Sequence, residues 1–139
     1  MQRIADGMGR GRAPSLRRVD VGDNGALGSG GVAALAGALA DCANLEHLGF
    51  CDCGVGGEGY EAVAAQVPLW PKLRELSAFD NPGPSDALGR ALAAALTDLP
   101  DLEAVNLVQS GLSKAVASEL RTAAVSAGRA LQLGGWGER

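Results

Sequence analysis

The chain has 139 residues, a length that fits one domain with a substantial core. Hydrophobic residues make up 47% of it but aromatic residues only 4%, so the interior must be built from Leu, Val and Ala and not from large rings. The formal net charge of -4 argues against nucleic acids and anionic membranes as partners, because both need a concentrated positive field.

Residues 1–15 hold few apolar side chains, with glycines and a proline set among arginines. Such a segment has too little apolar surface to form a capping repeat, so residues 1–15 are expected to be a flexible or incomplete leader. Leu16 and Val19, which follow it, would then lack a neighbour on one side.

From Leu16 onward, the short phrase L-x-x-L-x-L-x-x-N/C occurs four times, with other apolar residues standing in for some of the leucines. The phrases begin 28 or 29 residues apart, which is a spacing typical of leucine-rich repeats. Each phrase predicts a short strand, because its alternating apolar residues bury one side. The side chain at the ninth position is expected to point into the core and to form hydrogen bonds with the backbone of the turn that follows the strand. The four starts are Leu16, Leu45, Leu73 and Leu102, and the ninth positions are Asn24, Cys53, Asn81 and Ser110.

A helix is predicted after each strand, because apolar residues recur at helical spacing in 32–39, 62–67, 88–96 and 116–124. Ser85 and Asp86 predict the N-cap of the third helix. Residues 130–133 resemble one last strand, and 134–139 are expected to be a C-terminal tail. A single unit cannot bury its own apolar faces, so the units must stack with parallel strands on one side and helices on the other.

This unit of strand and helix resembles the ribonuclease-inhibitor-like subfamily of leucine-rich repeats, which also occurs in NOD-like receptors and in Ran GTPase-activating proteins. The resemblance covers about residues 16 to 127. Ser110 departs from the subfamily's alternation of Asn and Cys at the ninth position. The resemblance implies an α/β leucine-rich repeat solenoid, a short horseshoe of about four repeats within residues 16–133 that binds proteins on its concave side.

The cysteines, Cys42, Cys51 and Cys53, contain no C-x-x-C pair and follow no secretory leader, which predicts reduced thiols in an intracellular, cytoplasmic protein. Cys42 aligns with Trp70 and Leu99, each three residues before a phrase, so all three are expected to pack in the core. No apolar run approaches the roughly 20 residues that cross a bilayer, so no membrane association is expected.

Residues 54–59 satisfy G-x-G-x-x-G after a predicted strand, and Asp80 follows at about the spacing used for ribose binding. Val55, however, occupies the same repeat position as Leu27 and Leu112. The glycines are therefore predicted to form a tight loop from strand to helix. We expect no nucleotide and no other cofactor.

His47 is the only histidine, so any histidine-dependent catalysis would need it. Its third position in the phrase predicts an exposed side chain on the concave face, near Cys51. An open sheet offers neither an oxyanion hole nor a pocket that excludes water. Cys51 and Cys53 point in alternate directions and cannot converge with His47 on a zinc ion. No catalytic site and no metal site are therefore expected.

A binding surface is predicted on the concave sheet, where the third, fifth and seventh positions of each phrase face outward. The seventh column is largely apolar and the eighth is acidic, which is the composition of a small hot spot around Phe79 with a polar rim. The alternative is that Phe79 tucks against the adjacent strand. The predicted protein-binding residues are Arg18, Asp20, His47, Cys51, Asp52, Glu75, Ser77, Phe79, Asp80, Asn106 and Val108.

The sequence thus predicts a non-enzymatic protein-interaction module, as a section of a larger receptor or scaffold. The main alternative is a GTPase activator resembling the Ran-activating type, although those carry longer arrays and none of their catalytic residues can be matched here. A purely structural fragment is a third alternative. The strand at 16–21 would also offer unpaired backbone groups to another chain, which predicts self-association through the N-terminal edge.

Overall fold

The computed structural model describes residues 15–133, so the predicted leader in 1–14 and tail in 134–139 lie outside the described residues. Strands and helices alternate along the chain. They are β1 (Arg18–Asp20), α2 (Gly28–Ala38), β2 (His47–Gly49), α3 (Gly57–Gln66), β3 (Glu75–Ser77), α4 (Asp86–Ala95), β4 (Ala104–Asn106), α5 (Lys114–Ser126) and β5 (Gln132–Leu133). Two short 3-10 turns, η2 (Val67–Leu69) and η3 (Leu96–Asp98), continue α3 and α4.

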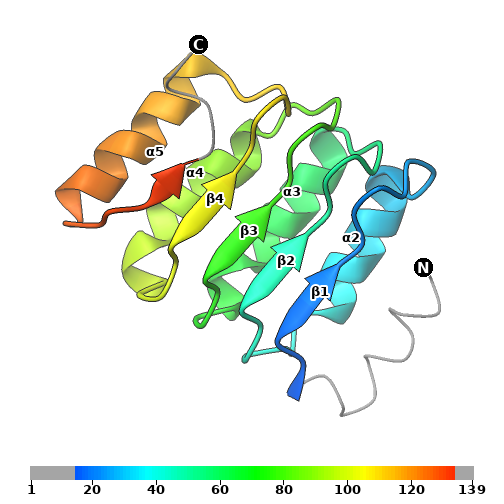
Figure 1. Cartoon of the computed structure of the whole chain (residues 1–139), viewed down its shortest axis with the longest axis horizontal. Helices are drawn as coiled ribbons and strands as arrows, with labels where there is room; N and C mark the ends of the chain where they lie inside the picture. Colours follow the sequence, from blue (N-terminus) through cyan, green and yellow to red (C-terminus); the bar gives the residue numbers. More distant parts are fainter. Residues whose placement is uncertain (1–14, 134–139) are drawn as a thin grey trace.

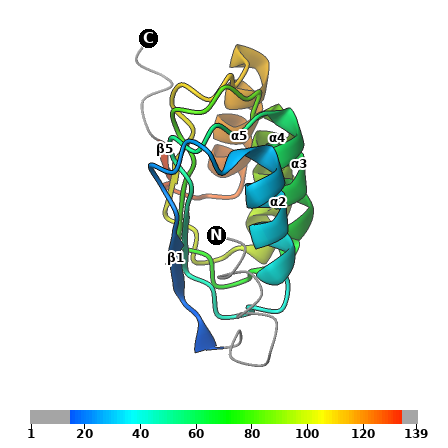
Figure 2. The ribbon, with the colours of Figure 1, turned by 90° about the vertical axis from the view of Figure 1, so that its right-hand side faces the viewer.

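The five strands form one parallel sheet in chain order, with α2 to α5 stacked on one of its faces (Figure 1). Viewed from the side, the sheet and the helices form two separate layers (Figure 2). The third phrase positions pair across the whole sheet in one register, from Arg18 through His47, Glu75 and Ala104 to Gln132. The predicted α/β solenoid is confirmed, and we call the face of the sheet away from the helices the concave face.

The core lies between the two layers and runs through every repeat. The central strand residues Leu48, Leu76 and Val105 are all buried against the helices. Phe50 and Leu107, which directly follow β2 and β4, are also buried. Val19 and Val21 belong to this core as well, although the sequence placed them at an uncovered end. Leu16 is half-buried.

The ninth position of the phrase supplies the polar part of the core. The Asn81 side-chain oxygen accepts hydrogen bonds from the backbone N–H groups of Cys53 (2.8 Å) and Val55 (3.1 Å). The Ser110 hydroxyl donates to the carbonyl of Leu107 at 2.6 Å, so it bonds the equivalent turn of the next repeat with fewer hydrogen bonds than Asn81 makes. Asn24 donates in the same way to the carbonyls of Val21 and Gly22, as its repeat position predicts, but it is exposed because its strand β1 lies at the edge of the described sheet.

The glycine-rich segment 54–59 is closely packed, both within its own repeat and against the preceding one. Gly54 has a φ of +68°, and a Cβ there would lie 2.7 Å from the carbonyl oxygen of Gly25. A Cβ at Gly59 would lie 2.5 Å from Cγ1 of Val55, which is itself fully buried. Both glycines are therefore required for packing. Residues 54–56 form the predicted loop from strand to helix, whereas residues 57–59 already belong to α3.

Two further predictions concern single side chains. Trp70 is fully buried and donates its indole N–H to the carbonyl of Leu39 at 2.8 Å, which confirms its place in the core. Ser85 does precede α4, but its side chain makes no capping bond. Its hydroxyl instead bonds that of Ser110 at 2.7 Å in the next repeat. The predicted side-chain cap is therefore wrong, because the contact between repeats takes the hydroxyl.

Candidate protein-binding face

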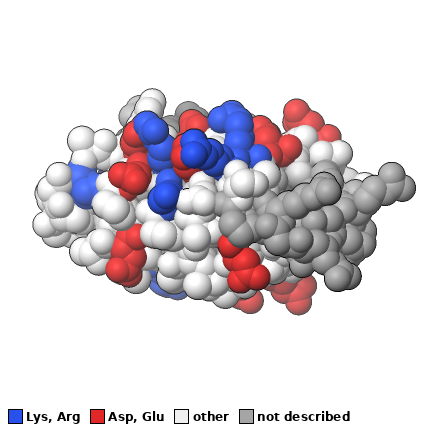
Figure 3. Space-filling view, turned by 90° about the horizontal axis from the view of Figure 1, so that it is seen from below, with Lys and Arg blue, Asp and Glu red and all other residues white. Residues whose placement is uncertain are grey.

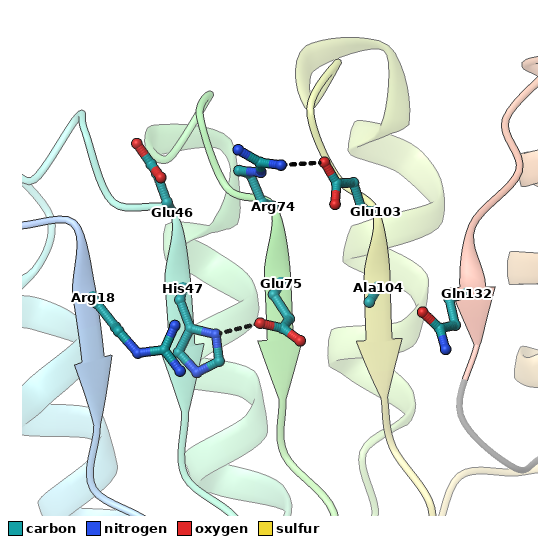
Figure 4. Close-up of a pocket in the computed structure, with 8 residues that line it drawn as sticks. All are labelled: Arg18, Glu46, His47, Arg74, Glu75, Glu103, Ala104 and Gln132. Atoms are coloured by element: carbon teal, nitrogen blue, oxygen red, sulfur yellow. Dashed lines mark hydrogen bonds and ion pairs between the residues drawn. The ribbon is translucent and has the colours of Figure 1, made fainter.

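Charged side chains of both signs gather where strands β1 to β4 begin. Seen from that end, lysine and arginine side chains lie interleaved with acidic ones along one side of the molecule (Figure 3). On the concave face beside this edge, a hollow of about 340 Å³ crosses the sheet (Figure 4). Its lining consists of Arg18, Glu46, His47, Arg74, Glu75, Glu103, Ala104 and Gln132.

His47 lies in this hollow but is not exposed, so that part of its prediction is wrong. Only 8% of the residue is accessible, and its Nδ1 lies 2.8 Å from Oε1 of Glu75 on the neighbouring strand. The position in the phrase correctly predicts that the ring points toward the concave side. It could not predict the burial, which depends on long side chains carried by the adjacent strands.

Four charged residues at the second position of the phrase were missed as part of this surface. Arg74 and Glu103 form an ion pair of 2.7 Å, and Arg17 and Glu46 form one of 3.9 Å. The signal was present in the sequence, because the second column reads Arg, Glu, Arg, Glu along the repeats. It was overlooked because only the third, fifth and seventh positions of the phrase were assigned to the concave face. Gln132 was missed because its short strand carries no full phrase.

The fifth position forms a shallow middle row. The carboxylate of Asp20 bonds the N–H of Gly22 at 2.9 Å, and a Cβ on Gly49 would lie 3.1 Å from that carboxylate. Asn106 makes the matching bond to the N–H of Val108 at 3.1 Å. Ser77 and Asn106 also line a second hollow of about 160 Å³. The structure thus brings these predicted residues together on one face.

The seventh position forms an apolar row of Cys51, Phe79 and Val108, each of them half-buried. The row is continuous across three strands, because the N–H of Asp52 bonds the carbonyl of Phe79 and the N–H of Asp80 bonds that of Val108. Phe79 is thus neither fully exposed nor fully buried. We call these three residues the apolar row.

The eighth position, next to the apolar row, is exposed and acidic at Asp23, Asp52 and Asp80. All three residues have a positive φ, of 64°, 50° and 57°. Asp tolerates this left-handed conformation better than most residues do. The left-handed backbone therefore suits aspartate at this position, and the three carboxylates lie beside the apolar row.

Neither ring nitrogen of His47 bonds the Cys51 thiol, because Nδ1 is bonded to Glu75 and Nε2 has no hydrogen-bond partner. Burial raises the pKa of the Cys51 thiol, and the nearby Asp23 and Asp20 raise it further. The thiol is therefore protonated at neutral pH and is a weak nucleophile. Within residues 15–133, no group of three or more His, Cys, Asp or Glu side chains could hold a metal ion.

Comparisons with known proteins bear on the fold. No protein-family model matches the chain, and no curated protein matches it. Among solved structures, the chain is similar to one described as leiomodin-1 actin-binding site 2, with a TM-score of 0.73 over 96% of this chain and 75% of that one. The fold is that of a short leucine-rich repeat solenoid. The sequence identity is 13%, so the likeness supports this repeat fold and not the ribonuclease-inhibitor-like subfamily.

The helices of the solenoid are short relative to a bilayer. In residues 15–133, no helix has the length and apolar character that a membrane crossing requires. The longest, α5, has 13 residues.

Proposed function

We propose that the chain is a protein-interaction module that binds its partner on the concave face. The observation that carries this proposal is the apolar row, which lies half-exposed beside an acidic column on the face that no described helix covers. Apolar side chains surrounded by polar ones are the usual composition of a binding hot spot. The predicted residues Arg18, Asp20, Glu75, Ser77 and Asn106 extend the surface toward the strand starts.

The structural neighbour supports a protein partner in general. Its description names an actin-binding site, so a domain of this fold serves there to bind a protein. Actin is accordingly the first defined protein to test against this chain. The formal net charge of -4 supports neither nucleic acid nor an anionic membrane as the partner.

The test compares two truncations of apolar side chains. Phe79→Ala removes the centre of the apolar row, whereas Val125→Ala removes a side chain on α5 that is 77% exposed. Purified wild-type chain and both variants are used to capture proteins from the native extract, and separately to co-sediment with actin filaments. We expect Phe79→Ala to weaken partner binding by about 2 kcal/mol and Val125→Ala to leave it unchanged.

Two results would refute the proposal. One is equal capture by the wild type and the folded Phe79→Ala variant. The other is faster GTP hydrolysis by a small GTPase in the presence of the chain, which would favour the GTPase-activator alternative.

We further propose a cytoplasmic location, on the basis of the cysteines. Cys42, Cys51 and Cys53 are all free, and two of them are fully buried as thiols. Proteins of reducing compartments keep such thiols without disulfides. Fractionation of native cells, with the chain detected by antibody, tests this location.

A further inference from the structure

One buried polar atom on the concave face has no hydrogen-bond partner. It is Nε2 of His47, and no other buried side-chain nitrogen or oxygen in residues 15–133 is in this position. The other ring nitrogen, Nδ1, is held by Glu75 at 2.8 Å. Buried polar groups are nearly always paired, so an orphaned one calls for an explanation. Here it lies in a residue that lines an open hollow.

Arg18 lies in the same hollow and has no ion pair within the described part of the chain. It pairs in register with His47 on the next strand, and its exposed side chain extends toward the imidazole from the side opposite Glu75 (Figure 4). The other charges of the hollow have partners. Arg74 bonds Glu103, Glu46 faces Arg17, and Glu75 holds the histidine. Arg18 is therefore the remaining cation of the hollow.

We propose that Arg18 and His47 together receive a carboxylate of the partner protein, from an Asp or Glu side chain. This inference rests on the proposed function and names the chemistry of one contact within it. The guanidinium pairs with the carboxylate through two parallel N–H bonds. Nε2–H of His47 donates a further bond, while Glu75 holds Nδ1–H on the other side of the ring. The exposed stem of Arg18 lets its guanidinium move with the incoming group.

The charges around the hollow favour a carboxylate over other ligands. Glu46, Glu75 and Glu103 all line it, so they repel a phosphate dianion more strongly than a carboxylate monoanion. A Lys or Arg side chain would meet the unpaired Arg18 and find each of the three carboxylates already partnered. A neutral amide could reach Nε2 but would leave Arg18 without an anion.

The experiment uses the full chain and a defined small probe. His47 is the only histidine, so its imidazole signals in a nuclear magnetic resonance spectrum are unambiguous. N-acetyl-aspartate methylamide is titrated at constant ionic strength, with the asparagine analogue as its neutral match. Methyl phosphate and N-acetyl-lysine methylamide serve as the competing chemistries. We expect saturable shifts of the His47 ring signals with the aspartate probe.

Two arginine variants test whether Arg18 binds the aspartate probe. Arg18→Gln should weaken binding of the aspartate probe about tenfold. Arg121→Gln, which removes an exposed arginine on α5, should leave it unchanged. Circular dichroism confirms that both variants are folded.

Several results would overturn this inference. They are no saturable shift with the aspartate probe, an equal response to the asparagine analogue, tighter binding of methyl phosphate or of the lysine probe, or an unchanged affinity in folded Arg18→Gln. Because the probe experiment needs no partner protein, any of these results would leave the proposed concave-face function standing. The capture experiment with Phe79→Ala decides that function separately.

Discussion

The side-chain oxygen of Asn81 accepts a hydrogen bond from the backbone N–H of Cys53, one repeat earlier in the chain. Its Nδ2 donates to the carbonyl of Phe50 at 3.1 Å and to the hydroxyl of Tyr60 at 3.1 Å. One buried amide thus joins the turns of two successive repeats and the helix between them. The first predictions concern this group and its neighbours.

Asn81→Ala should lower the free energy of unfolding by about 3 kcal/mol, because it leaves several buried backbone groups without a partner. Asn24→Ala is the matched control, since Asn24 holds the same repeat position but is exposed. Its effect should stay below about 1 kcal/mol. Urea unfolding followed by circular dichroism measures both. Equal losses would show that the exposed and buried amides contribute alike.

Gly54→Ala should destabilise the fold by about 2 kcal/mol, because alanine disfavours a φ of +68° and its methyl would meet the carbonyl of Gly25. Gly30→Ala in α2 is the control, since a Cβ there meets nothing within 4 Å. It should stabilise the protein by about 0.5 to 1 kcal/mol. Thermal unfolding of the two variants compares them directly. A neutral Gly54→Ala would contradict the tight approach between the first two repeats.

Tyr60, the only tyrosine, should ionise late. Burial raises its pKa from 10.0 to about 12, so the folded chain holds the phenol proton more tightly than the unfolded chain does. Tyr60 therefore contributes stability that is complete below the ordinary value of 10.0 and is lost as the pH rises toward about 12. Absorbance of the phenolate measures the ionisation. Tyr60→Phe, in the same pH range, should remove this part of the decline in unfolding free energy, and an identical decline in both proteins would refute the assignment.

The N-terminal edge should be the least stable part of the solenoid. Stability of a repeat array is roughly a sum of unit and interface terms, and β1 pairs with one described strand only. Hydrogen exchange should be faster in residues 16–40 than in residues 73–107. An ordered capping repeat fused before Leu16 should slow it, and the same edge should favour self-association at high concentration. Equal protection of both segments in a proven monomer would contradict this prediction.

The repeat positions predict much of this molecule because one periodic rule places every strand. The register from Arg18 to Ala104 and the burial of Leu48, Leu76 and Val105 follow directly from the alignment. The rule gives the direction of a side chain but not its neighbours in adjacent repeats. It therefore missed the burial of His47, which depends on its lateral neighbours.

The same limit explains two further errors. The hydroxyl of Ser85 is bonded to Ser110 in the following repeat, a contact that local capping preferences do not include. The ion pair of Arg74 and Glu103 also joins two repeats. A comparison of the second phrase position between successive repeats would have indicated the pair of Arg74 and Glu103, because arginine and glutamate alternate there.

Asp23, Asp52 and Asp80 have a left-handed backbone, and this conformation does not depend on their charge. Asparagine adopts the same conformation as readily as aspartate and is nearly equal in size. Exchanging all three for asparagine would keep the turns and raise the formal net charge from -4 to -1. Descendants of this sequence, or an engineer, can therefore change the electrostatic preference of the binding edge in steps of one charge without disturbing the fold.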